Sequence, residues 1–134
     1  MERLPSVDEV HTNHDEIVAE FDLDNAGVDG FFPDEKIREV IADARDEPTI
    51  SKRAAALLCG LPSLHVYEDG NKRTAWLTVV EFLDRHGREP AEVDPETVEV
   101  VMKSISRYNV SEIAQWLSNG TIDTERLVSA EPEN

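Results

Sequence analysis

The segment from His65 to His86 reads HVYEDGNKRTAWLTVVEFLDRH. Its first nine residues hold a histidine, an acid, a Gly-Asn turn and two adjacent cations. From Lys72 to His86 the apolar residues cover a wide surface at helical spacing, which predicts a central buried helix. Gly87 supplies a C-terminal stop. The segment therefore predicts a polar loop that leads directly into the middle of a helical core.

Helical periodicity continues on both sides of this segment. Capping signals place the starts of five further helices: a capping box of Ser6 with Glu9, then Asp34, Thr49, the pair Asp94-Pro95, and Ser111. We expect the first helix to run from about Val7 to Phe21 and the last to end at Asn119-Gly120. Gly60 and Pro62 should distort the last turn of the third helix. No alternating strand pattern is present, so we predict an all-α fold.

The chain length of 134 residues suits one compact domain with a single core. We expect residues 1–120 to form the helical domain. Residues 22–33 should form a loop that could hold a short hairpin. Residues 121–134 have the composition of a frayed acidic C-terminal tail.

Charge is the unusual part of the composition. The chain has 29 acidic and 13 basic residues, a net charge of −16, and four lysines beside nine arginines. Such a surface repels nucleic acid and anionic membranes, so neither is expected as a partner. Acidic residues spread along the whole chain, with little lysine, are typical of a halophilic, archaeal cytoplasm. An ordinary acidic cytosolic protein is the alternative interpretation.

Single features of the sequence narrow the setting further. Cys59 is the only cysteine, which excludes an internal disulfide and a cysteine-rich metal site. The opening Met1-Glu-Arg-Leu-Pro-Ser has no apolar signal segment, and no stretch approaches the roughly 20 apolar residues of a membrane span. We therefore expect a cytoplasmic location and no membrane partner.

The polar loop has the composition of an anion site at a helix N-terminus. Asp69-Gly70-Asn71 forms the turn, where free backbone N–H groups and the helix dipole attract a phosphate. Gly70 allows close approach of the backbone, and Asn71 can bind the anion and also fix the loop. Lys72 and Arg73 add charge and a bidentate fork. Because helix N-termini ordinarily favour acids, an anionic ligand explains the two cations.

Two further side chains beside this predicted phosphate site could take part in catalysis. Asp69 could coordinate Mg²⁺, which prefers one or two carboxylates with phosphate oxygens and water. His65 can be neutral near physiological pH and could accept the proton of an attacking hydroxyl. We expect Tyr67 to anchor the loop in the core. His14 is interpreted as a core histidine rather than a ligand, and His11 as a surface residue.

Each of these residues also has an ordinary structural interpretation. His65 could cap a helix, Asp69-Gly70 could be a plain turn, and Lys72-Arg73 could be a solvated pair. Their joint spacing favours function, because a chance match is on the order of one in a million per position. A P-loop is excluded, since the earlier glycine of G-x-x-x-x-G-K is absent and no strand precedes the motif.

The run His65-x-Tyr67-x-Asp69-Gly70-Asn71-Lys72-Arg73-Thr74-Ala75 resembles the signature of the Fic/Doc superfamily, H-x-F-x-[DE]-G-N-[GK]-R. Its Lys-Arg-Thr-Ala ending is similar to the Doc, or death-on-curing, branch. Weaker similarity extends from the Ser6-Val-Asp-Glu-Val opening to the Val110-Ser-Glu-Ile-Ala-Gln-Trp-Leu close, and so covers nearly the whole domain.

The resemblance implies a compact helical Fic fold and transfer of a phosphate-containing group from a nucleotide triphosphate, with Mg²⁺, to a protein hydroxyl. It implies that His65 is the general base, that Asp69 holds the metal, and that the nucleotide phosphates are bound by Gly70, Asn71, Lys72 and Arg73. Adenylylating relatives carry a second arginine where this chain has Trp76. The Doc interpretation is therefore favoured: the terminal phosphate of ATP moves to a translation elongation factor, and a partly disordered antitoxin neutralises the enzyme.

Three positions depart from the pattern of the resemblance. Tyr67 stands where Phe is usual, Ser63 stands where Doc-like proteins tend to have arginine, and Pro62 alters the approach to His65. Two classes of function stay open. One is an enzyme, either a Doc-like phosphotransferase or an adenylyltransferase. The other is a binding module that keeps nucleotide or antitoxin binding without catalysis.

Overall fold

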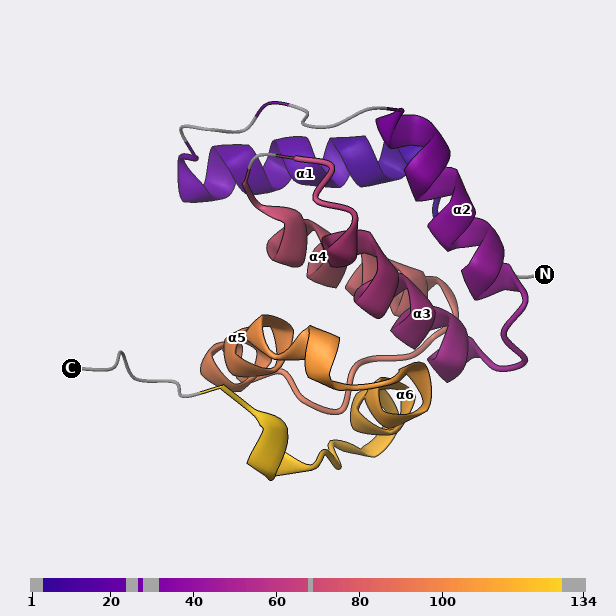
Figure 1. The fold of residues 1–134 in the computed structure, drawn as a ribbon, viewed down its shortest axis with the longest axis vertical. Helices are drawn as coiled ribbons and strands as arrows, with labels where there is room; N and C mark the ends of the chain where they lie inside the picture. The colour runs from indigo at the N-terminus through magenta and orange to yellow at the C-terminus, as the bar shows by residue number, and fades with distance from the viewer. Residues whose placement is uncertain (1–3, 24–26, 28–31, 68, 129–134) are drawn as a thin grey trace.

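The computed structural model describes residues 4–23, 27, 32–67 and 69–128. They form six α-helices and two short 3₁₀ helices, and apart from a single bridge residue, Tyr67, this described part contains no β-structure. The all-α fold is confirmed. Figure 1 shows the elements in chain order: α1 (Val7–Phe21), α2 (Pro33–Arg45), α3 (Ile50–Ser63), α4 (Asn71–Arg85), α5 (Pro95–Lys103), η1 (Ile105–Arg107), α6 (Val110–Asn119) and η2 (Thr124–Arg126).

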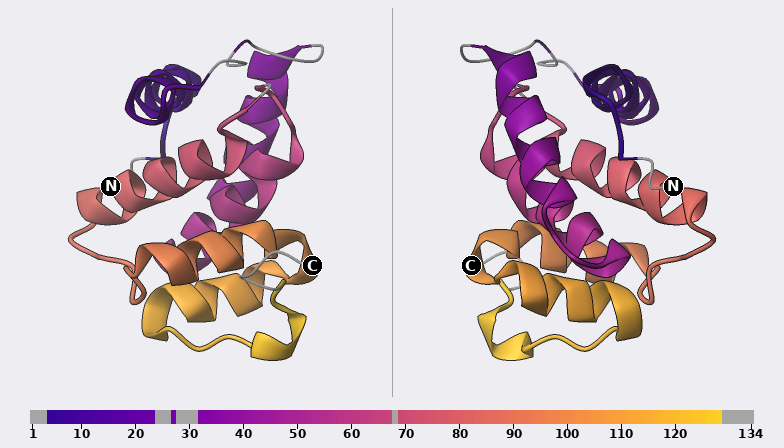
Figure 2. Two further views of the ribbon diagram at one scale, coloured as in Figure 1. Left: turned by 90° about the vertical axis from the view of Figure 1, so that its left-hand side faces the viewer. Right: turned by 90° about the vertical axis from the view of Figure 1, so that its right-hand side faces the viewer.

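The core forms around α3 and α4. α4 packs against α1 on one side and α3 on the other, as expected for a central helix, and α3 also packs against α2 and α6. In Figures 1 and 2, α1 and α2 lie at one end of the molecule and α5 and α6 at the other. The fully buried side chains of the two middle helices include Ala54, Ala55, Leu57 and Leu58 of α3 and Ala75, Val79 and Phe82 of α4.

Capping residues set the helix starts, with two corrections to the sequence interpretation. The capping box of Ser6 and the caps at Thr49 and Asp94 are confirmed. Asp34 does not cap α2, because Pro33 takes the first helical position and Phe32 precedes it. Ser111 does not cap α6. Asn109 does, since its side chain and Glu112 satisfy each other's backbone N–H groups in a capping box.

The end of α3 prepares the entry into the polar loop. Pro62 lies inside the last turn. The chain leaves the helix through two hydrogen bonds between residues three apart, from Leu64 N–H to Leu61 O and from His65 N–H to Pro62 O. Gly60 has a packing role here. A Cβ at Gly60 would lie 2.7 Å from Cγ1 of Val40, so the glycine lets α2 and α3 approach closely.

The segment after α6 differs from the frayed tail that its composition predicted. Arg126 of η2 forms an ion pair with Glu112 of α6, and the Val128 N–H donates to the hydroxyl of Ser104 at 2.8 Å. Residues 121–128 therefore pack on the domain. Residues 129–134 and most of the predicted hairpin at 22–33 lie outside the described residues.

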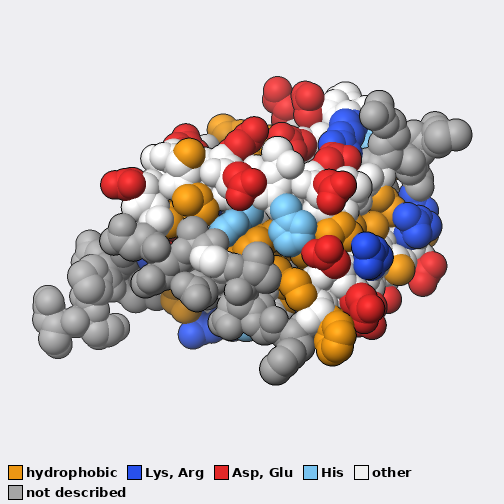
Figure 3. All heavy atoms as spheres, turned by 90° about the horizontal axis from the view of Figure 1, so that it is seen from above, with side chains coloured by type: hydrophobic (Ala, Val, Ile, Leu, Met, Phe, Trp, Pro, Cys, Tyr) orange, Lys and Arg blue, Asp and Glu red, His pale blue; other side chains and the backbone are white. Residues whose placement is uncertain are grey.

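The surface agrees with the composition. Aspartate and glutamate side chains are spread over the described face in Figure 3 rather than gathered in one patch. Among the described helices, none combines the length and the apolar character that a bilayer crossing requires.

Candidate active site

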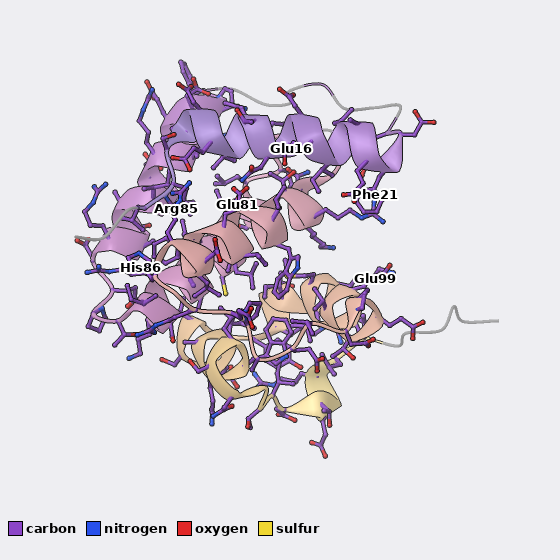
Figure 4. The ribbon with its side chains drawn as sticks, turned by 180° about the vertical axis from the view of Figure 1, so that it is seen from behind. Glu16, Phe21, Glu81, Arg85, His86 and Glu99 are labelled. Atoms are coloured by element: carbon purple, nitrogen blue, oxygen red, sulfur yellow. The ribbon has the colours of Figure 1, made fainter. Side chains whose placement is uncertain are left out.

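A cavity of about 720 Å³ opens where the end of α1, the polar loop, the start of α4 and one face of α5 meet. All six predicted site residues line it: His65, Asp69, Gly70, Asn71, Lys72 and Arg73. The structure therefore brings all six together around one cavity. In Figure 4, Phe21 at the end of α1 and Glu99 on α5 mark two of its sides.

The N-terminus of α4 is open toward a ligand. Its N-cap residue is Gly70, no side chain caps it, and its first turn contains no acid. The first helical hydrogen bond runs from Thr74 N–H to Gly70 O at 2.9 Å, so the N–H groups just before Thr74 have no helical acceptor. Lys72 and Arg73 are both exposed at this end. The arrangement combines backbone donors, the positive end of the dipole and two cations, which together suit a phosphate.

Gly70 and Asn71 shape the loop. Gly70 has φ of 83°, a conformation that favours glycine, and a Cβ there would lie 3.1 Å from Leu23 Cδ1, so the leucine side chain would have to shift. The Asn71 side chain accepts from Tyr67 N–H at 3.2 Å and donates to Tyr67 O at 2.8 Å. Asn71 thus fixes the loop as expected, while its binding of an anion stays a prediction.

His65 is exposed in the cavity and has an unusual backbone. Its φ is 49°, in the left-handed region that residues with side chains seldom occupy. His65 follows the end of α3 directly, and its N–H is bonded to Pro62 O at 3.3 Å. Backbone strain of this kind is concentrated at functional sites, where the surrounding structure sustains it.

The loop beyond His65 is held from α1. Tyr67 is only 4 % exposed, which confirms that it anchors the loop, and burial together with Asp15 and Asp34 raises its pKa. The His14 ring is stacked on the Tyr67 ring with centroids 3.6 Å apart. Nε2 of His14 lies 2.9 Å from the Asp69 carbonyl oxygen, so it is the donor there. His14 is buried and supports the site rather than facing the cavity.

Arg73 has a partner that the sequence did not suggest. Its guanidinium carbon lies 4.0 Å from the ring centroid of Phe21, a cation–π contact. Phe21 is the last residue of α1 and is 44 % exposed, so the contact forms at the rim of the cavity. It holds the Arg73 side chain beside the uncapped start of α4.

The far side of the cavity is mostly apolar, apart from Glu99 and Lys103 of α5, which form an ion pair. Its wall is formed by α4 and by the segment through α5, with Trp76, Leu77, Val80, Val93, Val98 and Met102. Trp76 also packs at an angle on Trp116, with ring centroids 5.8 Å apart. One helical turn after Arg73 the wall thus changes from cationic to aromatic.

The donor set fits Mg²⁺ better than a tightly chelated metal. No group of three or more His, Cys, Asp or Glu side chains placed to hold an ion occurs in the described ranges. One oxygen of the exposed Asp69 carboxylate accepts the Gly70 N–H at 2.8 Å. A single carboxylate beside a phosphate site suits Mg²⁺, whose other ligands are phosphate oxygens and water, and does not suit zinc.

The contacts of three residues around the site were not predicted from the sequence: those of Phe21, Asp34 and His11. His11 was interpreted as a surface residue, yet it bonds to the Tyr67 hydroxyl at 2.7 Å. The spacing of His11 and His14 places them on one helix face. That spacing was the available signal.

Comparison with known proteins identifies the family. A family model described as the Fic/DOC family matches residues 5–83, which is more than half of the chain and includes all six predicted site residues. No curated protein matches the sequence. Proteins of this family generally transfer nucleotide-derived groups to other proteins, with ATP and typically Mg²⁺. The motif around His65, the helical fold and the family match agree, and the chain belongs to the Fic/DOC family.

Proposed function

We propose that this protein is a Doc-like toxin that transfers the terminal phosphate of ATP to a hydroxyl group of a target protein. The observation that carries the proposal is the wall of the cavity beyond Arg73. The uncapped start of α4 offers one cationic phosphate site, and the next turn presents Trp76 instead of a second cation. In an ATP molecule whose terminal phosphate occupies that single site, the flat aromatic base could then pack against the aromatic side of the cavity.

The reaction assigns one task to each part of the site. His65 takes the proton of the target hydroxyl. The oxygen so activated bonds to the terminal phosphorus while the bond to the β-phosphate oxygen breaks, and ADP leaves. Lys72, Arg73 and the α4 N–H groups neutralise charge that spreads over the phosphoryl oxygens. A magnesium ion, held by Asp69 and the phosphates, would supply further charge neutralisation.

The partners in this proposal are proteins. By resemblance to the Doc branch the target is a translation elongation factor, which carries with it a cytoplasmic location, and the regulator is a cognate antitoxin. Phe21 and Val93 line the cavity and are 44 % and 71 % exposed. Large apolar side chains at such a rim suit an amphipathic antitoxin segment that folds as it binds. The acidic surface argues against nucleic acid as a partner.

The test is to incubate the protein and a lysate of its source organism, in high salt, with ATP labelled at the α or the γ phosphate. We expect label from the γ position on a protein, and none with the His65→Asn variant. Retention of the α label instead would establish adenylyl transfer. Retention of neither label, with ATP binding intact, would assign the protein to the class of binding modules.

A co-expression test addresses the antitoxin separately. We expect growth arrest on expression of the chain alone and relief by a small neighbouring reading frame. Arrest that no neighbour relieves would contradict the toxin–antitoxin part of the proposal and leave the transfer reaction to the labelling test.

A further inference from the structure

Three side chains from distant parts of the sequence form a continuous hydrogen-bonded chain behind the active-site loop. Oδ1 of Asp34, at the start of α2, lies 2.7 Å from Nε2 of His11 on α1. Nδ1 of the same imidazole lies 2.7 Å from the hydroxyl oxygen of Tyr67 in the loop. The chain thus connects three elements, and its inner end is buried.

The direction of each hydrogen bond follows from the chemistry of the two ends. The carboxylate of Asp34 can only accept, so Nε2 of His11 must carry the proton. In the neutral imidazole Nδ1 is then an acceptor, and the Tyr67 hydroxyl donates to it. Asp34 therefore selects the tautomer that gives the buried hydroxyl an acceptor. A carboxylate and an imidazole in this relation orient the group at the end of the chain.

Tyr67 passes this orientation to the site residues. Its backbone N–H and C=O are both bonded to Asn71 at the start of α4, and its ring is stacked on His14. His65 precedes Tyr67 by two residues and Asp69 follows it by two. A rotation of the Tyr67 side chain would therefore move the loop between the proposed base and the proposed metal ligand.

We propose that Asp34, His11 and Tyr67 are positioning residues, and that their hydrogen-bonded chain sets the placement of His65 and Asp69 for group transfer. The inference rests on the proposed function for its kinetic test. It goes beyond that function because none of the three residues faces the cavity. The ring of Tyr67 fills the core, and the hydroxyl adds the link to α1 and α2.

Matched substitutions separate this role from general stability. Tyr67→Phe keeps the stacked ring and removes only the hydroxyl. His11→Ala breaks the chain, whereas His11→Gln restores one acceptor and one donor at similar separation. Tyr108→Phe is the control, because Tyr108 is also buried and its hydroxyl donates to Asp123 O at 2.6 Å, in the C-terminal segment.

We expect Tyr67→Phe and His11→Ala each to lower kcat by about 10- to 100-fold, with a much smaller rise in the KM for ATP. The phosphate site of α4 is left intact, which is why binding should persist. The double variant should be no slower than the slower single variant, and His11→Gln should recover most of the rate. Additive losses, or an equal loss in Tyr108→Phe, would overturn the proposal.

A second measurement is independent of activity. Amide hydrogen exchange of Tyr67 and Gly70 in the ligand-free protein should speed up in Tyr67→Phe and His11→Ala and stay unchanged in His11→Gln and Tyr108→Phe. If the unmodified protein transfers no label, the proposed function is wrong. The hydrogen-exchange rates then still test whether Asp34, His11 and Tyr67 hold the loop. Unchanged exchange in Tyr67→Phe and His11→Ala would overturn it.

Discussion

The N-termini of α4 and α6 solve the same electrostatic problem in opposite ways. α6 begins with Asn109 and Glu112 in a capping box, and Arg126 covers the carboxylate. α4 begins with Gly70, has no side-chain cap, and places Lys72 and Arg73 in the first turn. At α6 the capping box thus satisfies the N–H groups of Asn109 and Glu112 within the protein, whereas no side chain caps α4.

The contrast teaches where this protein gives up stability for function. Cations at a helix N-terminus oppose the dipole, and at α4 the loop before them is held by contacts of Tyr67 and Asp69 with α1. At α6 the capping box and the Arg126–Glu112 ion pair act in the direction that the dipole favours. Substitutions at the two ends should therefore separate: changes at α4 should alter binding and transfer, and changes at α6 should alter the melting temperature.

The largest effect is expected at His65, beside the open end. Removal of the general base should lower transfer by about 10²- to 10⁴-fold, while ATP affinity stays near that of the unmodified protein. His65→Asn should be compared with His65→Ala, because asparagine adopts the left-handed conformation at φ of 49° more readily. Label transfer and calorimetric ATP titration measure the two quantities. Full activity in either variant would contradict the assignment of the base.

The next effect concerns Arg73. Arg73→Ala should weaken ATP binding by about 10- to 100-fold, since a hydrogen bond to a charged group contributes about 1.5–3 kcal/mol. The melting temperature of the ligand-free protein should not fall. Arg38→Ala, an exposed arginine of α2, is the control and should bind ATP normally. If Arg73→Ala lowered the melting temperature and left the affinity for ATP unchanged, Arg73 would serve folding rather than binding, which would contradict the contrast between α4 and α6.

At the closed end, Asn109→Ala should lower the free energy of unfolding by about 1 kcal/mol through loss of the N-cap. ATP affinity should be unaffected, because α6 does not line the cavity. Ser111→Ala is the matched control, since Ser111 is inside the helix and caps nothing. Urea titration of the two variants measures the difference. An equal loss in Ser111→Ala would show that the cap is not the cause.

The smallest effect is a pH dependence at the same end. The hydrogen bond from Arg126, and then the backbone N–H of Asn109, lower the pKa of Glu112 below its ordinary value of 4.5. A lowered pKa adds stability above pH 4.5 that is lost as the pH falls through the value in the folded protein. The melting temperature of Glu112→Gln should therefore lie below that of the unmodified protein at neutral pH, and the gap should narrow in acid. A gap independent of pH would contradict this linkage.

Much of the fold could be predicted because its signals are local. Apolar spacing of three and four residues predicted all six α-helices, and the polar caps of α1, α3 and α5 placed their starts. The predicted starts of α2 and α6 were each wrong by two residues and that of α4 by one, and the two 3₁₀ helices were not predicted. Pro33 competes with Asp34 for the first turn, and Asn109 has a better partner in Glu112 than Ser111 has.

In the candidate site, too, the residues that are neighbours in sequence could be predicted, and the contacts between distant residues could not. His65 and the run from Asp69 to Arg73 could be named from the sequence because they are contiguous. Their supports could not, since His11 lies 56 residues from Tyr67 and 23 from Asp34. The packed segment after α6 was missed for a related reason: composition records the charge of Arg126 but not the carboxylate that it meets.

The close approach of α2 and α3 at Gly60 also limits how the sequence can diverge. Any side chain at residue 60 would meet a methyl group of Val40, and a valine within a helix has few other rotamers. A larger residue at 60 is therefore compatible with this crossing only when residue 40 becomes smaller. In a set of homologous sequences the two positions should vary together, and an inverse correlation of their side-chain volumes would be the evolutionary record of one interhelical contact.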